Sequence, residues 1–187
     1  GIDMKRAGAL LIGLALNCLP LGVVLAFDVP YAAQAPVLDG DPGDAAWARA
    51  QWVPMAHLMW GTLPEKGDFS GRYKLVWNAQ HLYLLAEIVD DVLHDSHPDP
   101  LDQYWEDDAL EVFIDADASG GEHLFNYNAF AYHISLDNQA ADMGPFLSEQ
   151  DRQAEKTNVR LFPDHVQSRW KRSLDEPYKI YWELQIT

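Results

Sequence analysis

The sequence predicts an all-β fold, an antiparallel β-sandwich of the jelly-roll-like kind. Apolar and polar residues alternate over several short segments, turn-forming residues recur between these segments, and a helical period is almost absent. A strand that alternates in this way has one apolar face, and two sheets that cover each other's apolar faces form a sandwich. The length of 187 residues is sufficient for one domain with a substantial core.

The first residues of the chain resemble an export signal. Lys5 and Arg6 precede an apolar run that ends at a small-residue cleavage site, Ala26. We therefore predict a signal peptide over 1–26, a mature domain over 27–187, and a periplasmic or extracellular location. Because a run of about 20 apolar residues can cross a bilayer, an uncleaved anchor remains an alternative, and it is the only membrane contact that we expect.

Charge and cysteine content exclude several classes of function. The chain has 29 acidic and 13 basic residues, a net charge of −16, and such a polyanion is repelled by nucleic acids and by anionic membrane surfaces. A neutral ligand such as a sugar, or bound cations, are compatible with this charge. Cys18 is the single cysteine and lies in the predicted signal, so we expect no disulfide, thiol catalysis or cysteine-based zinc site.

The predicted elements begin with an extended segment, a Gly-Asp-Pro-Gly turn and one short helical turn around Trp47, which we interpret as a core anchor. Two strands follow at 71–78 and 81–91, and the four residues from Asn78 to His81 join them as a hairpin turn. Alternation within these two strands assigns Trp77 and Tyr83 to the core.

Further strands are expected along the rest of the chain, at 108–115, 125–137, 158–163, 165–170 and 178–187. Pro163-Asp164 indicates a hairpin between the third and fourth of these. The last strand reaches Thr187 without a turn or cap, and a sandwich that stopped there would expose an unpaired edge. We therefore expect that the natural protein continues and that its C-terminal strands are missing from this chain.

Three stretches resemble, in order and spacing, the carbohydrate-binding module family 9 and its single-domain exported relatives. They are "PVLDGDPGDAAWARA", "YKLVWNAQHLYLLAEIVDD" and "YWEDDALEVFIDADASGG", and "YNAFAYHISLD" resembles the strand that follows in the relatives. The resemblance covers the chain from about Pro36 to Thr187. It implies a β-sandwich that holds a sugar end between two tryptophans, while carboxylates and amides bond the sugar hydroxyls.

Under this resemblance, Trp105 and Glu111 stand at the positions of one tryptophan wall and one sugar-bonding carboxylate. The second tryptophan of the family lies in a region beyond Thr187. From the residues themselves, we interpret Trp105 as an exposed platform for a sugar ring, because the carboxylates around it oppose full burial. The alternative is a tryptophan that packs in the core. Asn126 and Asn128 alternate on the expected strand at 125–137, and amides pair well with hydroxyls.

Catalysis is the weaker interpretation of the carboxylates. Glu111 and Asp115 would project on one face of a strand roughly 13 Å apart, whereas glycosidase pairs lie about 5–9.5 Å apart. Glu106 and Asp108 could fall inside that window at the strand entrance. No Ser-His or Cys-His arrangement is evident in the sequence. A glycoside hydrolase, or an accessory module of one, remains the alternative to simple carbohydrate binding.

The stretch "DADASGGE" resembles the opening of a calcium loop, with Asp115, Asp117 and Ser119 at ligand positions. Asn126 stands where a bidentate glutamate belongs, so the stretch is not an EF-hand. We expect either a structural calcium ion, the one cofactor that the sequence suggests, or an ordinary hairpin loop.

Two histidine arrangements remain open. His94 and His97 form a possible metal pair, although loop histidines are usually plain polar residues. His133 and Met143 suggest haem b, because relatives of this sandwich bind haem through such residues, which would make the chain an electron-transfer domain. The function that the sequence favours is non-catalytic carbohydrate binding linked to carbohydrate catabolism.

Overall fold

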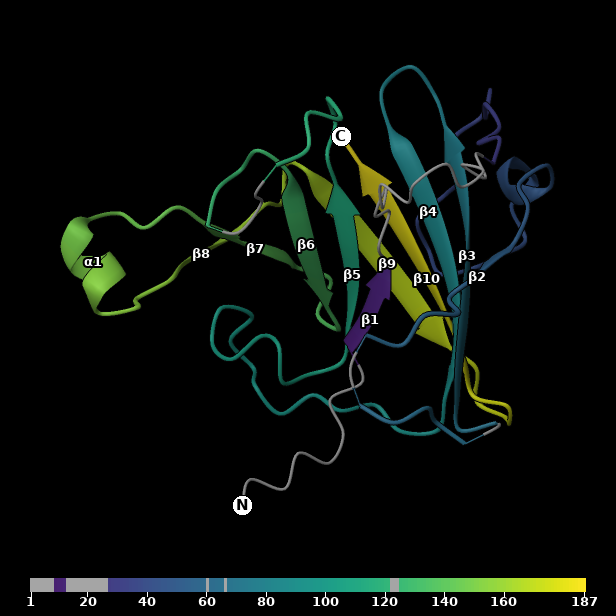
Figure 1. Cartoon of the computed structure of the whole chain (residues 1–187). Coiled ribbons are helices and arrows are strands. Elements are labelled where there is room, and N and C mark those ends of the chain that lie inside the picture. Colours follow the sequence, from purple (N-terminus) through teal and green to yellow (C-terminus); the bar gives the residue numbers. More distant parts are fainter. Residues whose placement is uncertain (1–8, 13–26, 60, 66, 122–124) are drawn as a thin grey trace, which may run out of the picture. The chain divides into compact units, whose positions relative to one another are not determined.

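A computed structural model describes residues 9–12, 27–59, 61–65, 67–121 and 125–187. Two compact units emerge from the chain. Among the described residues, one unit contains those of 9–12 and 94–163, and the other contains those of 27–93 and 164–187. Each unit has one five-stranded sheet (Figure 1). The predicted signal peptide lies outside the described residues apart from β1 (Ala9–Ile12), so its cleavage and the exported location stay predictions. Within the described residues, no helix has the length and apolar character needed to cross a membrane.

The sheet of the second unit is antiparallel throughout. Its strands are β2 (Val53–Pro54), β3 (Phe69–Trp77), β4 (Leu82–Asp90), β9 (Val166–Arg172) and β10 (Lys179–Ile186), in the order β2-β3-β4-β10-β9. The hairpin from Asn78 to His81 is confirmed. The expectation that the last strand is an unpaired edge is wrong, because β10 pairs with β4 on one side and with β9 on the other.

β4 is the most deeply placed strand of this sheet, with six consecutive buried positions. The segment before β2 folds over one face and includes the 3-10 turn η1 (Ala45–Trp47), as predicted. Trp47 is buried there against Val76, Tyr83 and Leu85. The assignment of Trp77 to the core is wrong. The residue is 45% exposed, and its indole N–H donates to the carbonyl of Val29.

A buried carboxylate fastens that segment to the sheet. Glu183 of β10 accepts hydrogen bonds from the backbone N–H groups of Asp39 and Gly40, both at 2.9 Å, and from the indole Nε1 of Trp47 at 3.1 Å. Burial raises the pKa of Glu183, while these three donors oppose the rise. The Asp-Gly and Trp of the first motif are therefore tied together by one side chain 136 or more residues away.

The sheet of the first unit has the order β1-β5-β6-β7-β8. Its strands are β1, β5 (Ala109–Ile114), β6 (Phe130–Ser135), β7 (Ala140–Gly144) and β8 (Asn158–Leu161). All its pairs are antiparallel except β1 with β5. The helix α1 (Glu149–Gln153), which was not predicted, begins at Ser148, whose side chain accepts a hydrogen bond from the N–H of Asp151.

Two further predictions about strands are wrong. The expected hairpin at Pro163-Asp164 does not form, because β8 pairs with β7 and β9 pairs with β10 in the other sheet. The strand expected at 125–137 begins only at Phe130, so the residues from 125 to 129 form turns and bends. Alternation is the source of both errors, because it carries no information about the partner of a strand or about the residue where pairing begins.

Replacing Gly40 by alanine should lower the free energy of unfolding by about 3 kcal/mol or more. Gly40 has φ +74°, and an added Cβ would lie 2.6 Å from the backbone N of Lys171 and 2.8 Å from the carbonyl carbon of Trp170. Gly61→Ala is the matched control, since Gly61 has φ +88° and nothing within 4 Å of an added Cβ. Urea unfolding of both variants measures the difference, and equal losses would show that the close approach at Gly40 is unimportant.

Candidate functional site

Trp105 lies in the long loop between β4 and β5, and the residue is 52% exposed. The indole Nε1–H donates to Glu106 Oε1 at 3.2 Å, and the ring meets Tyr104 edge-on with 5.2 Å between centroids. The alternative of a tryptophan packed in the core is therefore wrong. The indole is open to solvent and its orientation is held by two neighbours, as a platform for a ligand requires.

A histidine and a carboxylate lie behind Tyr104. The ring of His133 meets Tyr104 edge-on with 4.9 Å between centroids, and His133 Nδ1 is 2.9 Å from Glu111 Oε1. Glu111 on β5 and His133 on β6 face each other in the strand register. His133 is only 3% exposed, and its Nε2 has no hydrogen-bond partner among the described residues.

Glu111 is therefore linked to Trp105 through two intervening aromatic rings, those of His133 and Tyr104. Sequence reasoning placed Glu111 beside Trp105 but did not find the two residues between them. The sequence did contain a relevant pattern, because alternation assigns Glu111 to a face of its strand and His133 to a face of the next strand. It could be used only with a known register, which the sequence does not show.

The surroundings of Tyr104 are poorly hydrated and acidic. Burial raises the pKa of Tyr104, and the nearby carboxylates of Asp142 and Glu111 raise it further. Asp142 on β7 is itself buried, and burial raises its pKa to about 6 despite hydrogen bonds from the N–H groups of Met143 and Ala131. A cation or a hydroxyl donor is favoured here over an anion.

Replacing Asp142 by asparagine should change how stability depends on pH. An aspartate in the unfolded chain titrates at about 3.9, and Asp142 in the folded chain titrates at about 6. The native state thus holds the proton more tightly, so the stability from Asp142 is full below pH about 4 and is lost as the pH rises through about 6. Asp142→Asn should be more stable than the parent above pH 6 by roughly 1–3 kcal/mol and should lack this dependence.

Urea unfolding between pH 4 and pH 8 measures the effect of Asp142→Asn. Asp164→Asn serves as the control, because Asp164 is exposed and lies in the other unit. The pH profile of the control should match that of the parent. A profile of Asp142→Asn that also matches the parent would show that Asp142 titrates normally.

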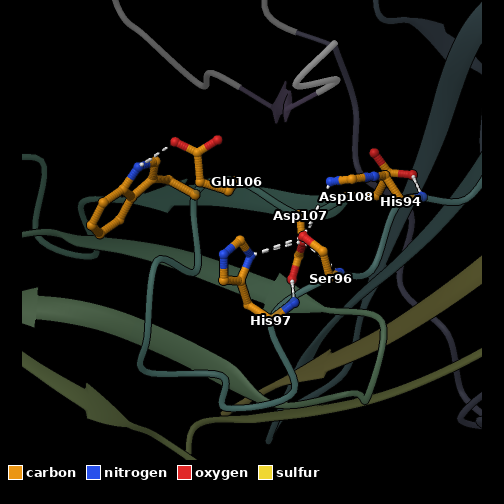
Figure 2. Close-up of polar contacts among 7 residues, drawn as sticks. His94, Ser96, His97, Glu106, Asp107 and Asp108 are labelled. Carbon is orange, nitrogen blue, oxygen red and sulfur yellow. Dashed lines mark hydrogen bonds and ion pairs between the residues drawn. The ribbon is translucent and has the colours of Figure 1, made fainter. Parts of the chain in front are cut away.

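The two ends of the loop that carries Trp105 are fastened by Asp107 (Figure 2). Asp107 accepts hydrogen bonds from the N–H of Ser96, the Oγ of Ser96 and the N–H of His97, each at 2.8 Å, and its Oδ1 is 3.1 Å from His97 Nδ1. Burial alone would raise the pKa of Asp107, but these donors outweigh it and lower the pKa to about 2. Asp108 adds a second connection between the loop ends. Its Oδ2 accepts a hydrogen bond from the N–H of His94, and its own N–H donates to the carbonyl of His94.

The cluster contains a serine, a histidine and an aspartate in contact, an arrangement that was not evident in the sequence. It does not have the geometry of a nucleophilic triad, in which the serine and the aspartate bind opposite nitrogens of one imidazole. Here Ser96 Oγ donates directly to Asp107, and both lie near the same nitrogen, Nδ1, of His97. The arrangement orients a carboxylate and does not activate a hydroxyl group.

The predicted amide ligands lie elsewhere than expected. Asn126 and Asn128 do not alternate on a strand, because both precede β6 in the bend region. Asn128 donates from Nδ2 to the carbonyl of Gly120 at 2.8 Å, and its N–H donates to Asn126 Oδ1. These contacts tie the two asparagines to the loop that follows β5, and their role in ligand binding stays a prediction.

The same loop holds the predicted calcium ligands. Asp115 Oδ2 accepts from the N–H of Gly120 at 2.8 Å, and Asp117 Oδ1 accepts from the N–H of Ser119 at 3.0 Å. The other oxygen of Asp115, Oδ1, is buried without a hydrogen-bond partner among the described residues. As the side chains stand, no three His, Cys, Asp or Glu residues of the described chain are placed to hold a metal ion.

The residues suggested for haem lie on neighbouring strands. His133 on β6 faces Ala141 of β7, and Met143 is two positions further along β7. Both therefore extend from one sheet face, whereas two axial ligands of a haem iron approach from opposite sides of the ring. Haem binding stays a prediction that this register does not favour.

Comparison with known proteins places the chain in a family. Residues 38–187 match the family described as carbohydrate family 9 binding domain-like. The endo-1,4-beta-xylanases A of Thermotoga neapolitana and Thermotoga maritima are each 30% identical to the chain over 80 residues, which are 43% of the chain and 7% of each xylanase. The chain thus spans only a small part of these relatives.

Two solved structures of a family 9 carbohydrate-binding module from Caldicellulosiruptor kristjanssonii resemble the chain at 20% identity. The cellotriose complex has a TM-score of 0.54, covering 84% of this chain and 65% of the other, and the glucose complex has a TM-score of 0.50, covering 84% and 67%. The all-β fold of antiparallel sheets, a β-sandwich of this class, is therefore confirmed. Because the family match spans most of its length, the chain belongs to the carbohydrate family 9 binding domain-like family.

Proposed function

We propose that the chain binds carbohydrate without cutting it, with a sugar ring stacked on Trp105. The observation that carries this proposal is the open, oriented indole of Trp105 beside Tyr104. An aromatic face of this kind suits the C–H face of a pyranose, which needs apolar contact and no charge. Support comes from the solved family 9 modules, which are complexes with cellotriose and glucose, and from the xylanases among the relatives.

Polar groups near the platform would set the orientation of the sugar. Glu111 lies on the strand that follows the loop of Trp105, and its contact with His133 fixes the carboxylate in one direction. A fixed carboxylate accepts hydrogen bonds from hydroxyls with little loss of side-chain entropy on binding. The surrounding acidic groups disfavour anionic sugars, so we propose neutral oligo- or polysaccharide ends as ligands.

The carboxylates around Trp105 support binding over hydrolysis. Glu106 accepts the indole N–H, Asp107 and Asp108 fasten the loop, and Glu111 contacts His133. A general acid needs a carboxyl group that can deliver a proton to the sugar oxygen, yet Asp107 has a pKa of about 2 and stays ionised. Each of these carboxylates is engaged in a structural contact, and we assign none of them a catalytic role.

Replacing Trp105 by alanine should weaken binding to soluble cello-oligosaccharides by about 10–30-fold, because roughly 2 kcal/mol of stacking is lost. Titration calorimetry measures the affinity, and thermal unfolding should show no large change, since the ring is half exposed. Trp77→Ala is the matched control, because Trp77 is similarly exposed but lies in the other unit. Full affinity in Trp105→Ala would contradict the proposal, and so would release of reducing sugar by the parent protein.

We also propose a structural calcium ion in the loop of Asp115, Asp117 and Ser119. The supporting observation is Asp115 Oδ1, a buried carboxylate oxygen that lacks a hydrogen-bond partner among the described residues. Oxygen-rich loops with this residue order are suited to calcium. Adding millimolar calcium should raise the melting temperature and a chelator should lower it, and Asp115→Asn should remove both effects. An unchanged melting temperature would leave an ordinary hairpin loop.

A further inference from the structure

Four atoms that could coordinate a metal ion lie close together at the base of the Trp105 loop (Figure 2). Ser96 Oγ lies 3.2 Å from His94 Nε2, 3.1 Å from His97 Nδ1 and 2.8 Å from Asp107 Oδ1. Asp107 Oδ1 is in turn 3.1 Å from His97 Nδ1 and 3.8 Å from His94 Nε2. Two imidazole nitrogens, a carboxylate oxygen and a hydroxyl oxygen therefore occupy a small volume.

These separations are close to those of a tetrahedral metal centre. Ligands about 2.0–2.2 Å from a zinc ion lie roughly 3.3 Å from one another. With the side chains as they stand, the described chain holds no ready-made group of three His, Cys, Asp or Glu ligands, and the Ser96 hydroxyl links the two histidines and Asp107 by hydrogen bonds. An ion would replace these hydrogen bonds and would have to draw His94 Nε2 and Asp107 Oδ1 together from 3.8 Å.

We propose that His94, His97 and Asp107 bind a divalent transition-metal ion, with Zn²⁺ the ion that this ligand set fits best. Imidazole nitrogens and a carboxylate oxygen are common zinc ligands, and Ser96 or a water molecule would complete four-fold coordination. The proposed site goes beyond carbohydrate binding, since its ligands do not include Trp105 or Glu111 and it needs no sugar.

The hydrogen bonds at Asp107 support this assignment. Its Oδ1 atom is approached by three donors, the N–H and Oγ of Ser96 and the Nδ1 of His97. A carboxylate oxygen has two lone pairs, so three donors on one oxygen exceed its normal capacity. A metal ion would replace the two side-chain donors, Ser96 Oγ and His97 Nδ1. The backbone N–H groups of Ser96 and His97 would continue to orient the carboxylate, as outer-shell donors do at metal centres.

Charge and access also suit a cation. Asp107 supplies a carboxylate, a ligand type that divalent cations accept. Residues 94–163 include 15 acidic and 3 basic side chains, which makes the local field attractive to cations. The side chain of His94 is 51% exposed, so an ion can reach the cluster from solvent.

The test is titration of the chelator-treated full chain with ZnCl₂ by calorimetry, without sugar. One Zn²⁺ should bind per chain, and Co²⁺ in its place should give the visible absorption bands of a four-coordinate ion with nitrogen and oxygen ligands. Absence of both signals in the folded parent protein would overturn the proposal. Because no sugar is used, this outcome would leave the role of Trp105 untouched.

Variants locate the ion within the cluster. His94→Gln and His97→Gln should each weaken Zn²⁺ binding by more than about tenfold, whereas Ser96→Ala should retain it, because both histidines and Asp107 remain. His57→Ala is the matched control, since His57 is exposed and lies outside the loop. Unchanged Zn²⁺ affinity in folded His97→Gln, or a loss in His57→Ala, would also overturn the proposal.

Discussion

Asp107 accepts four hydrogen bonds from Ser96 and His97, which stand at the opposite end of the loop that carries Trp105. The loop has little regular structure of its own, so without such bonds its closure would cost chain entropy with no compensation. Because Asp107 is only two residues from Trp105, its fastening also fixes where the indole can lie. The open platform therefore depends on a carboxylate that does not touch the proposed ligand.

Glu183 plays the same part for the segment before β2 that Asp107 plays for the Trp105 loop. Both are buried acids that accept backbone N–H groups from segments without regular structure. Buried backbone donors need acceptors, and a carboxylate can accept several at once. Their pKa values move in opposite directions, because burial dominates at Glu183 and hydrogen bonds dominate at Asp107. Part of the acidity of this chain is thus structural and not merely a property of its surface.

Alternation along the chain predicted most of the strands, the β3–β4 hairpin and the burial of Trp47, because these depend on neighbours in sequence. It failed where a partner had to be chosen. The hairpin at Pro163-Asp164, the supposed free edge at β10 and the strand position of Asn126 and Asn128 were all wrong, since pairing depends on distant segments. The contact between His133 and Glu111 was missed for the same reason, as 22 residues separate them. Trp105 was predictable because its carboxylate neighbours oppose burial locally.

Four carboxylates lie close together in the sequence around Trp105, a pattern that is compatible with one catalytic or metal-binding site. In the structure each has a different partner, and the differences follow from position. Glu106 is adjacent to the indole and takes its N–H, Asp107 and Asp108 turn back toward the start of the loop, and Glu111 has entered β5, where the register places it opposite His133. Asp107 is the one member of this set that meets two imidazoles and a hydroxyl at once. An ion bound there would tighten the same fastening that hydrogen bonds provide, so metal binding and the orientation of Trp105 would be coupled through a single side chain.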